Sequence, residues 1–119
     1  MSTGSIDVQS RAANPGLMQI GTDDFRLAAN PPAGSPPQLT FSWAYRDAGH
    51  PVTAGPCTVT AELTGPGNYD QQQHSTACVG SPASAFDVTT PGLYGISVEV
   101  TPPGGGSPTA ATRTVTVRG

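Results

Sequence analysis

Residues 38–46, with the sequence Gln-Leu-Thr-Phe-Ser-Trp-Ala-Tyr-Arg, carry the strongest structural signal in the chain. The large apolar side chains occupy every second position: Leu39, Phe41, Trp43 and Tyr45. The residues between them are small: Thr40, Ser42 and Ala44. Because side chains alternate between the two faces of a β-strand, this pattern predicts a strand with one aromatic-rich face packed on a core.

Shorter alternating runs lie on both sides of this segment. Further strands are predicted over residues 17–20, 25–29, 58–63, 85–88, 93–100 and 112–117. Segments rich in Gly, Pro, Asn and Asp separate them at residues 30–37, 47–51, 65–68 and 101–108, where such residues favour turns. About seven short strands with turns at roughly ten-residue spacing are typical of an antiparallel, immunoglobulin-like β-sandwich.

Composition agrees with a single ordered domain. The chain has 119 residues, with 13 Pro and 15 Gly, and only 11% of its residues are charged. Disordered chains usually combine high net charge with few alternating apolar residues, whereas the net charge here is −3. We therefore expect short strands joined by long turns rather than disorder.

Charge and hydropathy exclude two classes of partner. The five basic residues are all Arg, and they are scattered: Arg11, Arg26, Arg46, Arg113 and Arg118. Phosphate binding needs a clustered basic surface, so no nucleic-acid partner is expected. No stretch approaches the roughly 20 apolar residues of a membrane-spanning helix, so no membrane insertion is expected. The first 16 residues also lack the basic and apolar regions of a signal peptide.

The segment Leu-Thr-Phe-Ser-Trp-Ala-Tyr-Arg-Asp-Ala-Gly at residues 39–49 resembles the Trp-x-Phe-Gly-Asp-Gly-like signature of PKD domains. Trp43, Tyr45, Asp47 and Gly49 match its Trp, aromatic, Asp and closing Gly, whereas Arg46 replaces a Gly. Residues 91–100 are similar to the Pro-Gly-x-Tyr-x-Val-x-Val strand of that family, and residues 112–117 to its last strand.

This resemblance covers about residues 16–118 and implies an immunoglobulin-like sandwich that acts as a spacer or binding module. It divides the chain into an N-terminal arm, residues 1–16, and a PKD-like domain, residues 17–119. Cys57 and Cys78 lie outside the family pattern.

The two cysteines are expected to form a disulfide. If a hairpin turns at residues 65–70, paired positions sum to 135, so that position 64 opposes 71 and Cys57 opposes Cys78. Opposed residues have Cα atoms about 4.5 to 5.5 Å apart, within the range of a disulfide. The alternative is a pair of free thiols. A metal site is not expected, because it would need more ligands than these two cysteines.

No catalytic, cofactor or metal site is expected. His50 lies in a Gly-Pro turn and His74 in a Gln-rich strand, so both are predicted to be surface residues. No Ser, Cys or carboxylate lies in a recognisable catalytic motif. Asp23, Asp24 and Asp47 could meet at one end of the sandwich around Ca²⁺, but a strand start and a turn explain them better.

Three candidate interaction residues remain: Ile6, Val8 and Tyr69. Ile6 and Val8 are the sizeable aliphatic residues that follow Met1 in the arm, and they would anchor it as an added strand on a neighbouring subunit. In a free-standing domain the same segment would instead form an extra edge strand of its own sandwich. Tyr69 follows a Gly-Pro-Gly-Asn turn, where an exposed aromatic residue is a candidate contact.

Two other aromatic residues are expected to be structural. Trp43 alternates with core residues, so packing in the core is preferred over stacking on a glycan. Tyr94 resembles the tyrosine of a tyrosine corner.

These features favour a non-enzymatic structural module, a phage capsid decoration protein at the virion surface that binds shell subunits or itself. The alternative is an extracellular or cell-surface PKD-like module that binds glycan or protein. A disulfide fits either destination, because both are oxidising.

Overall fold

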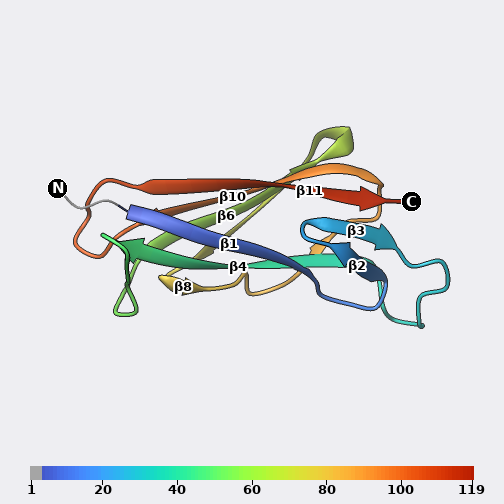
Figure 1. Cartoon of the computed structure of the whole chain (residues 1–119), viewed down its shortest axis with the longest axis horizontal. Coiled ribbons are helices and arrows are strands. Elements are labelled where there is room, and N and C mark those ends of the chain that lie inside the picture. Colours follow the sequence, from blue (N-terminus) through green and yellow to red (C-terminus); the bar gives the residue numbers. More distant parts are fainter. Residues whose placement is uncertain (1–3) are drawn as a thin grey trace.

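The aromatic segment forms the long strand that its alternation predicts, β4 (Gln38–Asp47). The computed structural model describes residues 4–119, and within them β4 is the centre of one of two sheets (Figure 1). That sheet contains β1 (Gly4–Ala12), β4, β5 (His50–Pro51), β8 (Val79–Gly80) and β9 (Phe86–Asp87). All of β1 pairs with β4, from Gly4 opposite Asp47 to Ala12 opposite Leu39. The three short strands pair with the other edge of β4.

The second sheet has the order β2-β3-β11-β10-β6-β7. Its strands are β2 (Leu17–Gly21), β3 (Asp24–Leu27), β11 (Thr109–Arg118), β10 (Gly92–Thr101), β6 (Thr58–Gly65) and β7 (Tyr69–Ser75). The pair β3–β11 is parallel, whereas the neighbouring pairs of this sheet are antiparallel. The prediction of a purely antiparallel sandwich was therefore wrong at this pair.

One core fills the space between the sheets, because both contribute apolar residues at alternate positions. β4 supplies Leu39, Phe41, Trp43 and Tyr45, and β10 supplies Tyr94, Ile96, Val98 and Val100. The rings of Phe41 and Phe86 stack with centroids 5.6 Å apart, which closes the core where β9 pairs with β4. The alternation that predicted these strands therefore also predicted their buried faces.

The N-terminal segment belongs to the sandwich and is not a separate arm. From Gly4 to Ala12 it forms β1, and its side chains alternate between buried and exposed positions. β1 also lies against β11 of the second sheet, so it covers one open side of the sandwich (Figure 1). Met1 to Thr3, the remainder of the expected arm before β1, lie outside the described residues.

The structure adds two strands to the expected ones, β5 and β8. It contains β7 as the second strand of the expected hairpin, and β1 as the strand that a free-standing domain would form from its N-terminal segment. β5 and β8 have two residues each, too few for a period of two to show. β7 is polar because it lies at the end of its sheet, with exposed residues on its outer face. In residues 4–119 no helix is long and apolar enough to cross a membrane.

Candidate functional site

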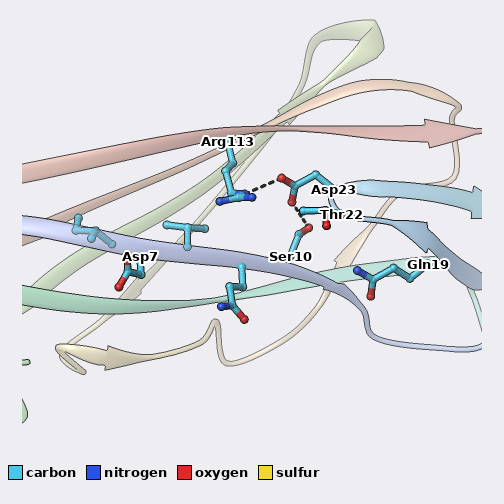
Figure 2. A pocket seen from close by; sticks show the side chains of 9 residues that line it. Asp7, Ser10, Gln19, Thr22, Asp23 and Arg113 are labelled. Atoms are coloured by element: carbon cyan, nitrogen blue, oxygen red, sulfur yellow. Dashed lines mark hydrogen bonds and ion pairs between the residues drawn. The ribbon is translucent and has the colours of Figure 1, made fainter.

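A polar groove of about 490 Å³ lies beside β1, where the turn between β2 and β3 approaches β11 (Figure 2). Asp23 is at its centre. Its carboxylate accepts a hydrogen bond from Ser10 Oγ of β1 at 2.5 Å and an ion-paired hydrogen bond from Arg113 Nε of β11 at 2.7 Å. Figure 2 shows the Ser10 and Arg113 side chains pointing toward Asp23 from the two sheets.

The backbone of Asp23 reinforces this junction. Its carbonyl accepts the Thr116 N–H at 2.9 Å, and its φ of 55° turns the chain sharply into β3. Asp23 therefore connects the β2–β3 turn with β1 and β11. A carboxylate with both oxygens engaged is suited to holding the sheets together. The other polar side chains that line the groove are those of Asp7, Gln9, Gln19 and Thr22.

A second feature, an apolar and basic surface, lies on the outer face of the second sheet. Met18 and Leu93 are 51% and 65% exposed. Met18 opposes Arg26 in β3, and Arg26 opposes Arg118 in β11, so these three side chains form one row. Leu93 opposes Thr116, which lies two residues before Arg118 on the same face of β11.

Ile20, 44% exposed, adds to this surface at an irregularity in the pairing of β2 with β3. We call Met18, Ile20, Leu93, Arg26 and Arg118 the β2–β10 surface. Hydrogen bonding to Asp24 raises the pKa of Arg118, whose guanidinium stays charged. The sequence predicted the strands of this surface but not which residues they expose, because only the sheet order brings β2 and β10 to one face.

The two cysteines form the expected disulfide, and their Cα atoms lie 5.2 Å apart. The register behind that prediction was wrong by one residue. β6 and β7 pair with positions that sum to 134, as in Thr60 opposite His74, because the hairpin closes with Gly65 opposite Tyr69. The bond still forms because the chain leaves the ladder after Ser75, and Cys57 N–H then donates to Thr76 O at 3.0 Å.

This departure brings the disulfide between the two sheets. Beyond β7 the chain crosses to β4, where Tyr45 N–H donates to Cys78 O at 3.0 Å and Trp43 Nε1–H to Ala77 O at 2.8 Å. Both cysteines are buried. The disulfide therefore fixes the crossing segment against the start of β6.

The three candidate interaction residues lie within the domain rather than projecting from it. Val8 is 5% exposed, and Ile6 is half-buried against the same core. They pair with Trp43 and Tyr45 of β4, so the structure places them in the protein's own sandwich, not as anchors on a neighbour. Tyr69 is half-buried too, with its ring 5.7 Å from that of Tyr94 in an edge-on arrangement, and burial raises the pKa of its hydroxyl.

The residues considered for chemistry are dispersed. His50 is exposed in β5, and the exposed His74 lies 3.4 Å from Thr60 Oγ1. Asp47 opposes Gly4, whereas Asp23 binds Ser10, six residues further along β1 and thus roughly 20 Å away. Among residues 4–119 no three His, Cys, Asp or Glu side chains are grouped as metal ligands.

Comparisons with known proteins do not assign the chain to a family. No family model matches the chain, and neither a curated protein nor a solved structure matches it with significance.

Proposed function

We propose that this protein is an immunoglobulin-like module of the PKD type that acts without catalysis, by docking on a protein shell. The particular role we propose is decoration of a phage capsid at the virion surface, with shell subunits as the partner. The observation that carries the docking role is the β2–β10 surface, on which apolar side chains lie exposed beside two arginines.

The strand order supports the immunoglobulin-like class. In that fold strands A, B and E share one sheet, while C, F and G, with C′ in the variable type, share the other. Here β1, β4 and β9 occupy the places of A, B and E, and β7, β6, β10 and β11 those of C′, C, F and G. Tyr94, near the start of β10, donates its hydroxyl to Thr90 O at 2.5 Å, the arrangement of a tyrosine corner.

Two features depart from antibody domains. Trp43 lies on the strand in the place of B, whereas the hallmark Trp of antibody domains lies on C. Cys57 and Cys78 join the start of β6 to the crossing segment rather than bridging B and F. Both departures favour a sandwich outside the antibody group, as the PKD resemblance implies.

The composition of the β2–β10 surface fits protein recognition. Met and Arg are enriched in protein interfaces, where an apolar centre is bordered by polar residues. Arg118 is ion-paired with Asp24, while none of the ion pairs in residues 4–119 includes Arg26. A partner with an apolar surface and a carboxylate opposite Arg26 would complement it.

The decisive experiment is binding to shells of the source phage that have been stripped of this protein. We expect the wild type to co-sediment with the shells, and a Met18→Asp, Leu93→Asp double variant to stay in the supernatant. Val79→Asp is the matched control, because Val79 is 47% exposed but belongs to the other sheet. If the double variant binds as well as the wild type, the β2–β10 surface is not the docking face.

The disulfide also fits the alternative, an extracellular PKD-like module that binds glycan or protein. The same experiment separates the two roles. A decoration protein binds purified shells, whereas an extracellular module leaves them bare and binds a glycan array or a cell surface.

A further inference from the structure

The strand β7 ends the second sheet and leaves one main-chain edge open. It pairs with β6 along its whole length, from Tyr69 to Ser75, with no shift in register, and no strand of residues 4–119 pairs with its other edge. An open edge offers unpaired N–H and C=O groups to a further strand. Charged side chains (Lys above all), Pro and bulges commonly protect such edges. β7 has no Pro, Lys or Arg and no bulge, and Asp70 is its one carboxylate.

The other long or exposed edges are better protected. β1 lies against β11, and β2 is interrupted by a shift in register between Gln19 and Gly21. β7 is therefore the edge of residues 4–119 best suited to accept a strand. In Figure 1 the turn that joins β6 to β7 stands out from the rest of the fold. On the inner side of β7 the Gln73 side chain hydrogen-bonds the backbone of Ser84, and the main-chain edge of β7 has no strand beside it in residues 4–119.

The sequence of β7 is complementary to itself when reversed. Asp70, Gln72 and His74 alternate along its exposed outer face. If a second copy pairs antiparallel about a two-fold axis at Gln72, paired positions sum to 144. Asp70 then opposes His74 of the other copy, and Gln71 opposes its Gln73. A shift of two residues in either direction removes the Asp–His pairs, so charge selects this register.

We propose that two copies of this chain associate through their β7 strands, in antiparallel register centred on Gln72. The interface is isologous, so each copy contributes the same edge, and the association closes as a dimer. Two six-stranded sheets then join into one. The β2–β10 surface begins at the other end of the sheet order and extends to β10, which β6 separates from β7. Main-chain pairing at the β7 edge leaves this surface uncovered, so the association is independent of the proposed docking face.

Other polar and charged groups lie around the expected contact. Asp70 opposes Thr64 on β6 and has Glu62 as its diagonal neighbour, and hydrogen bonding with Glu62 raises the pKa of Asp70. Thr60, from β6, is the group that faces His74, while Asp87 lies across the groove on the inner side of β7. Each copy therefore places Asp70, with Glu62 on the diagonal beside it, opposite the other copy's His74.

Sedimentation velocity over a range of protein concentrations tests this association. We expect a dimer that dissociates on dilution. His74→Gln should weaken dimerisation by about tenfold, because the two Asp70–His74 pairs across the two-fold axis are lost. His74 is exposed, so circular dichroism should show an unchanged strand content in this variant.

The exchange variant Asp70→His, His74→Asp is the sharpest control. It restores the Asp–His pairs across the two-fold axis and should recover the dimer, whereas Asp70→His alone should not. A wild type that remains monomeric at the highest concentration overturns the proposal. So does an exchange variant that stays monomeric, or a His74→Gln variant that dimerises like the wild type. Growth beyond the dimer would show a head-to-tail contact instead and would equally overturn it.

Discussion

Gly65 lies directly against the ring of Tyr94. A Cβ atom at position 65 would be 2.5 Å from both Cδ2 and Cε2 of that ring, closer than side chains pack. The hydroxyl of Tyr94 is held at the same time by Thr90 O, so the ring cannot move aside freely. The end of β6 and the start of β10 thus depend on a glycine that the sequence shows only as part of a turn.

Gly65→Ala should therefore destabilise the fold. Overpacking a filled site costs about 1 to 3 kcal/mol, and we expect a loss in this range in the free energy of unfolding measured with urea. Gly21→Ala is the control, because its Cβ would meet Asp24 at an ordinary 3.5 Å. Equal stability of the two variants would contradict the close approach.

Alkaline pH should weaken the fold through Tyr69 and Tyr94. Burial raises the pKa of both hydroxyls above their ordinary value of 10.0. A raised pKa in the folded state means that the folded protein holds the proton more tightly. The stability contributed by these groups is complete below about pH 10 and is lost as pH rises through the folded-state pKa values.

Chemical denaturation between about pH 9 and pH 11 measures this effect, with tyrosinate absorbance as a direct titration. Tyr69→Phe should flatten the decline in stability at high pH. Tyr94→Phe should flatten it as well, but it should also cost about 1 kcal/mol at neutral pH by removing the hydrogen bond to Thr90. If stability falls with pH as steeply in both variants as in the wild type, groups other than Tyr69 and Tyr94 cause the decline.

The sequence predicted the interior of this fold better than its edges. Alternation around Trp43 and Ile96 identified both central strands and their buried faces, because burial on one face imposes a period of two. β1 was anticipated only as an alternative to an arm, because two aliphatic residues, Ile6 and Val8, give a weak signal although they are enough for an edge that packs on one side. The β2–β10 surface could not be predicted, because it depends on the parallel pairing of β3 with β11.

The disulfide between Cys57 and Cys78 was predicted correctly, although the hairpin register used to predict it was wrong by one residue. Its removal, by Cys57→Ala together with Cys78→Ala, should lower stability by about 3 kcal/mol in the chain-entropy model, since it closes a separation of 21 residues. Thermal unfolding with and without reductant checks this. Reduction should change the wild type but not the double variant, and the strand content should be the same in both.

The turn after β4 offers a stabilising substitution. Ala48 and Gly49 both have positive φ, 51° and 82°, as a two-residue type I′ hairpin turn requires. Asn tolerates this conformation better than Ala, so Ala48→Asn should stabilise the protein by about 0.5 to 1 kcal/mol. Gly49→Ala should do the opposite, although its side chain would meet no atom within 4 Å, which isolates the backbone effect.

Trp43 combines apolar burial with one specific hydrogen bond, and two substitutions can separate them. The side chain is 1% exposed, and its Nε1–H donates to Ala77 O in the segment that carries Cys78. Trp43→Ala should cost about 3 to 5 kcal/mol, enough to unfold many domains of this size. Trp43→Phe keeps most of the apolar volume but leaves the carbonyl of Ala77 without its donor.

We therefore expect Trp43→Phe to remain folded, with a smaller loss in the free energy of unfolding than Trp43→Ala. Relative to the wild type, the amide exchange rates should increase more in residues 76–80 than in β10. Fluorescence of the wild type provides the direct check on burial, because a buried indole emits at shorter wavelength than one in water. An emission typical of exposed indole would contradict the packing of β4. Uniformly faster exchange throughout Trp43→Phe would show instead that the hydrogen bond to Ala77 stabilises the whole sandwich, and not this segment in particular.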